Sequence, residues 1–291
     1  MKKLFAIIIT SIFPYIAMSQ GVIFEKEDSI RIESMLHDLA DNKPTAELLT
    51  EIANAFVDEK YVPGTLEQGI DEPLTISCSR LDCTTFVELV VAIAMSARNG
   101  DTDFGSVCQN LERIRYRNGK NCGYASRLHY ISWWITDGAK SGIVQEITAL
   151  MSNERQGGYL NYMSTHPDSY PLLVEYPHLI NEIANREKIS NMDNTCYIPK
   201  ERLSNCSTLD IREGDIIAIT TSIKGLVFRE FFLGRKSYAS LLIMAVVVPF
   251  MFMLFMLSAK FGNLRLMEDV DEIIETIYIM SLYMPAVIFS S

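Results

Sequence analysis

The sequence has no cluster of lysines and arginines, no cysteine pair of the kind that binds metal, and no histidine after residue 178. Its 291 residues carry a net charge of -10 and show no Lys/Arg-dense face or tail. This argues against binding to nucleic acid and favours a small or neutral substrate. The six cysteines form neither a C-x-x-C pair nor a Cys/His cluster of the zinc-finger kind, so we expect no structural metal. The histidines are His37, His129, His166 and His178.

A hydrophobic content of 48% allows a substantial core and predicts one domain. Residues 1–19 have two lysines, an apolar stretch and then Ala17-Met18-Ser19, the order of a cleaved secretory signal. The apolar stretch is shorter than the roughly 20 residues that span a bilayer, and no cysteine follows it as in a lipoprotein. We therefore expect an exported protein of the periplasm or cell envelope.

Apolar positions recur at helical spacing through residues 26–58, with a break at Asn42-Lys43-Pro44, and predict two N-terminal helices. Further helices are expected around residues 107–115 and 131–135. A short β-branched run at residues 216–221 follows Glu213-Gly214-Asp215 and predicts a strand.

The stretch RLDCTTFVELVVAIAM, residues 80–95, places Cys83 directly before a run that is apolar nearly all round. From Thr85 on it predicts a helix buried on most sides. Either Asp82 or Thr85 can cap this helix, the latter with Glu88 at the capping-box spacing. A cap at Asp82 leaves Cys83 in the first turn, where free backbone N–H groups and the helix dipole stabilise a thiolate. The alternative is an inert, packed cysteine.

The arginines at 113, 115 and 117 stand at alternate positions. They could clamp a phosphate or carboxylate, but this spacing is more typical of a solvated edge, and we favour that interpretation.

Two histidines are candidates for substrate binding. His129 lies between Ser126-Arg127 and a pair of tryptophans, among the polar and aromatic neighbours that build substrate pockets. His166 lies in the loop Ser164-Thr165-His166-Pro167, where it lines a cleft or caps a turn. His37 and His178 fall on polar helical stretches and are expected at the surface.

Several motifs together resemble a known family. YVPGT at residues 61–65, followed by LDCTTFV, resembles the tyrosine-loop and aspartate-cysteine motifs of NlpC-type cysteine peptidases. RLDCTTFVE, YASRLHY, MSTHPDSYPLL, YIPK and EGDIIAITTSIKGL are similar to the N-acetylmuramoyl-L-alanine amidase-like branch of that group, in order from about residue 50 to Leu226. The resemblance implies an α+β, papain-like domain over residues 20–226. In it, the nucleophile helix packs on an antiparallel, barrel-like sheet, with extra helices at the N-terminus.

The resemblance also implies a reaction. The Cys83 thiolate attacks the amide between N-acetylmuramic acid and L-alanine, and water hydrolyses the acyl-enzyme. The backbone N–H of Cys83 helps to form the oxyanion hole, and Tyr61 lies against the site as a substrate-binding residue with His129 and His166. The implied substrates are peptidoglycan fragments (muropeptides), and neither a metal nor an organic cofactor is required.

The sequence departs from the family after the Gly-Asp strand. Relatives carry a Ser-His-Val-Gly type segment with the catalytic base there, whereas residues 227–232 here read VFREFF and no histidine follows His178. Glu230 is a carboxylate that could accept a proton. An inactive, muropeptide-binding relative and a disrupted reading frame are the alternatives to an active enzyme.

Residues 227–291 form a divergent C-terminal part. Within it, the 23 residues 237–259 carry no charge and would reach roughly 35 Å as a helix, enough to span a membrane. A membrane-tethered envelope protein is therefore an alternative. We favour completion of the sheet, by strands at 241–248, 250–257, 264–267 and 286–289 with a helix at 270–277.

Overall fold

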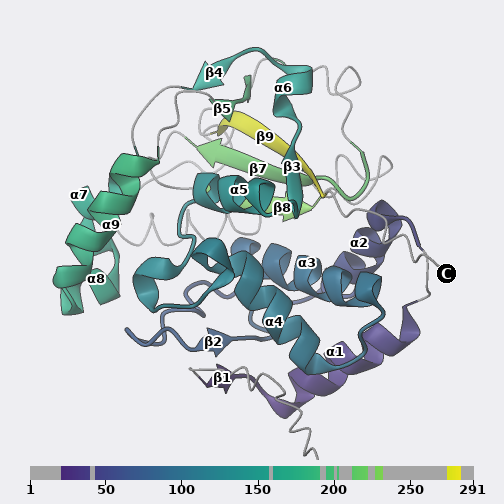
Figure 1. Ribbon diagram of the computed structural model, residues 1–291. Helices are drawn as coiled ribbons and strands as arrows, with labels where there is room; N and C mark the ends of the chain where they lie inside the picture. The colour runs from purple at the N-terminus through teal and green to yellow at the C-terminus, as the bar shows by residue number, and fades with distance from the viewer. Residues whose placement is uncertain are drawn as a thin grey trace, which may run out of the picture.

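The computed structural model describes residues 21–39, 43–156, 160–190, 195–199, 202, 212–221, 227–231 and 274–282. Over these ranges the chain is a mixed α+β structure, mostly helical, with a small sheet. In Figure 1 helices α1 to α4 gather on one side, the sheet lies on the other, and α7 to α9 stand at the flank.

The two predicted N-terminal helices are confirmed as α1, Lys26–Asp38, and α2, Thr45–Asn54. Pro44 is the N-cap residue of α2, and the helix begins there because a proline keeps the residue before it out of the helical region. Just before α1, strand β1 (Val22–Ile23) pairs in parallel with β2 (Leu74–Thr75). This pairing ties the start of the described chain to the segment that leads to Cys83.

The helix predicted after Asp82 is confirmed as α3, Cys83–Asn99. Its sides are buried by α1, α2 and α4 (Phe104–Arg115), which explains why its sequence is apolar nearly all round. It ends at Gly100, whose φ of 76° lies in the left-handed region that a glycine adopts without strain.

A series of short helices and strands follows α4 in the chain. Among them α5 contacts both α4 and β3, and so joins the helices to the sheet (Figure 1). They are η1 (Arg117–Gly119), η2 (Tyr124–Ser126), α5 (Ile131–Lys140), β3 (Val144–Glu146), α6 (Thr148–Met151), β4 (Arg155–Gln156), α7 (Tyr162–Thr165), η3 (Pro167–Ser169), α8 (Pro171–Glu175), α9 (His178–Ile189), β5 (Thr195–Cys196) and β6 (Ile198–Pro199).

The main sheet is antiparallel, with strand order β3-β9-β7-β8 and β6 also paired to β9. The predicted strand at 216–221 is confirmed as β7, Ile216–Thr221, which pairs with β8 (Val227–Phe231) and β9 (Ile274–Leu282). Strand β8 contacts α3, so one strand of this sheet lies against the helix that Cys83 begins.

The helix predicted over residues 270–277 is wrong, because Ile274–Leu282 forms β9. Strand β9 pairs antiparallel with β3, β6 and β7, and its β-branched residues suit this position. The signal at 1–19, the uncharged run 237–259 and the strands expected at 241–248, 250–257, 264–267 and 286–289 lie outside the described residues. None of the helices within the described ranges is long and apolar enough to cross a membrane.

Candidate active site

Cys83 is the first residue of α3 and is half-buried. Asp82 is the N-cap, and its Oδ1 accepts hydrogen bonds from the backbone N–H groups of Thr84 (3.0 Å) and Thr85 (2.8 Å). The Asp82 N–H in turn donates to Thr85 Oγ1 at 2.8 Å, which completes a capping box. Of the two caps that the sequence allows, the structure therefore selects Asp82, which leaves the thiol at the positive end of the helix dipole.

Tyr61 is brought to Cys83 by backbone pairing. It forms a parallel bridge with Leu81, and the N–H of Val62 donates to the Leu81 carbonyl at 2.8 Å. Burial raises the pKa of the Tyr61 hydroxyl, and the negative charges of Cys83 and Asp82 raise it further. Tyr61 is therefore a neutral hydroxyl that can donate a hydrogen bond.

His129 contacts Tyr124 through a hydrogen bond and through its ring. Its Nε2 lies 2.9 Å from the Tyr124 carbonyl oxygen, and the two rings are 4.5 Å apart. Because a carbonyl only accepts, Nε2 carries the proton and Nδ1 keeps its lone pair. Burial lowers the pKa of His129 well below its usual range, and the charge of Arg127 lowers it further. His129 is therefore a neutral acceptor at physiological pH.

His166 is exposed and stacks on Tyr162, with ring centroids 4.3 Å apart and an angle of 14° between the planes. Its Nδ1 lies 2.9 Å from Thr165 Oγ1 and 3.2 Å from the Tyr162 carbonyl oxygen. The structure thus brings Tyr61 to Cys83, whereas His129 and His166 each contact a tyrosine a few residues earlier in their own segment. His37 and His178 are exposed, as expected.

A buried ion pair joins the cysteine helix, α3, to α4. Arg115 Nε is 2.8 Å from Glu88 Oε2, both side chains are 2% exposed, and Arg115 Nη1 donates to the Thr75 carbonyl. The prediction of a solvated edge is therefore wrong for Arg115, although Arg113 is exposed. The sequence carried one signal of this pair, which is the acidic Glu88 inside an otherwise apolar helix.

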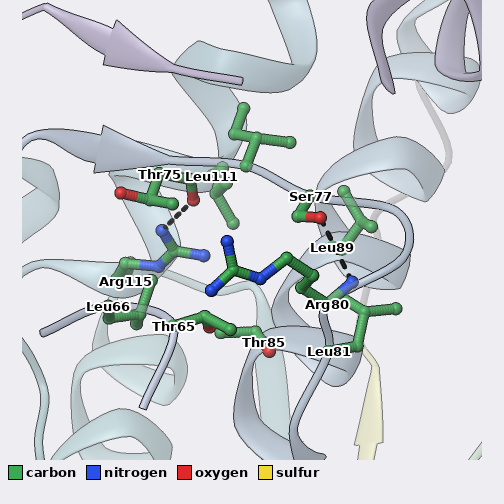
Figure 2. A pocket seen from close by; sticks show the side chains of 11 residues that line it. Thr65, Leu66, Thr75, Ser77, Arg80, Leu81, Thr85, Leu89, Leu111 and Arg115 are labelled. Atoms are coloured by element: carbon green, nitrogen blue, oxygen red, sulfur yellow. Dashed lines mark hydrogen bonds between the residues drawn. The ribbon is translucent and has the colours of Figure 1, made fainter. Parts of the chain in front are cut away.

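A small cavity lies between the loop that follows Tyr61, at Thr65 and Leu66, strand β2 and the first turns of α3 (Figure 2). Thr65, Thr85 and Leu89 line it, and Figure 2 shows the Arg80 side chain extending toward Arg115 across it. Its volume of about 10 Å³ is room for a single water molecule. A larger groove of about 580 Å³ lies between α1 and α2, and Cys83 lines neither space.

Cys78, Cys83, Cys108, Cys122 and Cys196 are thiols that take part in no disulfide. Cys78 and Cys108 are buried, and burial raises the pKa of Cys78 to about 12 and that of Cys108 to about 11. Neither thiol ionises near neutral pH, so they are packed cysteines. In the part of the chain that the structure describes, no three His, Cys, Asp or Glu side chains gather as a metal-binding group.

Comparison with known proteins places the chain in a family. The sequence model of the AmiA-like family, described as N-acetylmuramoyl-L-alanine amidase-like, matches residues 51–229. This range contains Tyr61, Cys83, His129 and His166. No curated protein matches the chain.

Solved structures from bacteria share the fold. An N-acetylmuramoyl-L-alanine amidase from Bacteroides uniformis is 29% identical with a TM-score of 0.67, and the match covers 82% of this chain and 99% of that one. A candidate xylanase from Bacteroides fragilis is 33% identical with a TM-score of 0.64, over 80% of this chain and 100% of that one. A Legionella pneumophila protein, 20% identical with a TM-score of 0.61, covers 89% of this chain and 95% of its own and shows the fold alone.

Proposed function

Since the chain belongs to the N-acetylmuramoyl-L-alanine amidase-like family, we propose that it is a cell-wall amidase whose nucleophile is Cys83. The observation that carries this proposal is the half-buried thiol in the first turn of α3, with the neutral Tyr61 hydroxyl held close to it. A thiolate is the nucleophilic form of cysteine, and the start of a helix favours it.

The proposed bond is the amide that joins the lactyl group of N-acetylmuramic acid to L-alanine. The Cys83 sulfur attacks the amide carbonyl carbon, the carbonyl oxygen becomes an oxyanion, and the C–N bond breaks as the alanine nitrogen takes a proton. Water then attacks the thioester, which frees the muramic carboxyl group and the thiol. The Cys83 backbone N–H and the Tyr61 hydroxyl are donors for the oxyanion, and one such donor is worth about 3–4 kcal/mol in other enzymes.

The reaction needs a group that gives a proton to the leaving nitrogen, and the lack of an obvious one raises a second candidate function. His129 and His166 make their contacts with tyrosines, and no histidine follows His178. The missing later histidine makes a protein that binds muropeptides without turning them over the second candidate. The Glu230→Gln variant tests whether a carboxyl group on β8, the strand that contacts α3, supplies this proton.

We further propose that the fold is of the papain-like NlpC type, and that residues 20–226 are its catalytic domain. Residues 1–19 would export it to the periplasm or cell envelope, where peptidoglycan lies. Residues 227–291 would complete the sheet, and β8 and β9 within this range support that role. If the chain instead stays with membranes after alkaline carbonate extraction, residues 237–259 tether it.

The test is mass spectrometry of the purified mature chain incubated with a muramyl tripeptide. The parent should separate sugar from peptide, Cys83→Ala should not, and Cys122→Ala should match the parent because Cys122 is an exposed thiol of another segment. A folded parent that binds the peptide without cleaving it would establish the binding protein. Release of sugars from xylan in a parallel sample would instead point to the activity named for the Bacteroides fragilis relative.

A further inference from the structure

The loop that carries Tyr61 runs from residue 61 to residue 72. At its start the backbone pairs with Leu81, and at Gly64 it turns so that the N–H of Glu67 donates to the Gly64 carbonyl at 3.2 Å. A second turn closes where the N–H of Glu72 donates to the Gly69 carbonyl at 3.2 Å. Between these turns the loop carries two acidic residues, Glu67 and Glu72, that contact another segment of the chain.

Arg127 supplies this contact from the segment after α4. Its Nη2 is 2.6 Å from Glu67 Oε1 and its Nε is 3.0 Å from Glu72 Oε1. The arginine and Glu72 side chains are 10% and 2% exposed, and that of Glu67 is 29% exposed. The guanidinium also lies 5.1 Å from the centre of the Tyr124 ring. One buried arginine thus holds both turns of the loop, a task for which the planar guanidinium is suited and a lysine is not.

The backbone of the loop indicates that this hold is needed. Glu72 has a φ of 48°, a left-handed conformation that residues other than glycine rarely adopt. Its carbonyl accepts a hydrogen bond from Asn121 Nδ2 at 2.6 Å, so contacts on both the side chain and the backbone fix it in place. Such conformations persist where the surrounding structure over-determines them, often beside functional sites.

We propose that Arg127 is a positioning residue for the Cys83 site, which it serves by holding residues 61–72 so that Tyr61 stays against the thiol. The proposal rests on the proposed function, in which Tyr61 is a donor at the reacting centre. It also links the segment of His129, two residues beyond Arg127, to the cysteine side of the site.

The test measures alkylation of Cys83 by iodoacetamide against pH, with each cysteine resolved by peptide mass spectrometry. In the Arg127→Gln variant we expect Tyr61 to move away from Cys83, so that the Cys83 thiolate loses the neutral hydroxyl beside it. The midpoint of the alkylation profile should therefore rise, and the limiting rate at high pH should increase because the thiol is more open. Arg127→Lys should rescue this only in part.

Two further variants show that the effect passes through Tyr61. Tyr61→Phe alone should raise the midpoint, and adding Arg127→Gln to it should raise the midpoint little more, because both changes remove the same hydroxyl. Arg98→Gln is the matched control. Arg98 donates to the Lys43 carbonyl at 2.9 Å from the far end of α3, 15 residues from Cys83, and its variant should leave the profile unchanged.

Additive shifts in the double variant, or an unchanged profile in a folded Arg127→Gln protein, would overturn the proposal. Should Arg127→Gln not fold, Glu67→Gln takes its place, since Glu67 is the more exposed partner and Arg127 keeps Glu72. Alkylation needs no turnover, so a chain that binds muropeptides without cleaving them still gives a result. The failure of the proposed function is therefore separate from the failure of this inference.

Discussion

Tyr61, Asp82 and Cys83, the cysteine side of the candidate site, are joined by a backbone bridge and a helix cap. His129 and His166, the histidine side, lie on segments whose ring contacts are with Tyr124 and Tyr162. The cysteine side is backed by buried ion pairs, whereas His166 is exposed. Because buried contacts cost more to remove than exposed ones, changes on the cysteine side should destabilise the protein more than changes at His166.

The largest effect is expected at the ion pair between Glu88 of α3 and Arg115 of α4. Arg115→Ala leaves the Glu88 charge buried without its partner and should lower the free energy of unfolding by about 3–5 kcal/mol in urea titrations. Arg113→Ala, two residues earlier on the same helix and exposed, should change it by less than about 0.5 kcal/mol. Equal effects of the two variants would remove the contrast between the two arginines.

A pH effect of intermediate size is expected at Glu72. Burial raises the pKa of this carboxyl group to about 7. The charge of Arg127 lowers the pKa in part, and the negative charge of Glu67 raises it. Because the folded pKa lies above the unfolded value, stability from Glu72 is fully present below about pH 4 and is lost as the pH rises through 7.

Stability curves at pH 5 and pH 8 should therefore differ more for the parent than for Glu72→Gln, by about 1–3 kcal/mol. An identical pH dependence in the two proteins would show that Glu72 is ionised in the folded state throughout. The curves come from urea unfolding in buffers of matched ionic strength.

A smaller effect is expected at the helix cap. Asp82→Ala removes the acceptor for Thr84 N and Thr85 N and should lower the free energy of unfolding by about 1 kcal/mol. Asp82→Asn keeps a good cap and should cost less, while the loss of a negative charge beside Cys83 moves the alkylation profile of the thiol to lower pH. A profile that moves upward instead would contradict the proximity of Asp82 and Cys83.

The smallest effect on stability is expected on the histidine side. His166→Ala removes an exposed ring and should change the free energy of unfolding by less than about 0.5 kcal/mol. If His166 binds substrate, the same variant weakens binding of a muramyl tripeptide by about two- to tenfold, the loss of one hydrogen bond. Calorimetric titration measures this, and unchanged affinity would remove His166 from the site.

Sequence reasoning succeeded where the determining contacts are local. Asp82 was one of two local candidates for the cap of α3, and the helix period of α1, α2 and α4 is visible in single segments. It failed at residues 270–277, because whether an apolar stretch becomes strand or helix depends on partners such as β7, which lies far away in the chain. It also failed for Arg115, since its burial depends on Glu88 from another helix.

By itself the sequence determined the helix that begins at Cys83, its cap at one of two positions, and the motifs that identify the family, because these depend on neighbours along the chain. Only the tertiary structure paired Tyr61 with Leu81 and placed Arg127 between Glu67 and Glu72. Those contacts join residues up to 60 positions apart. Their free energy depends on burial and on exact partner geometry, which arise only when the helices and loops pack together.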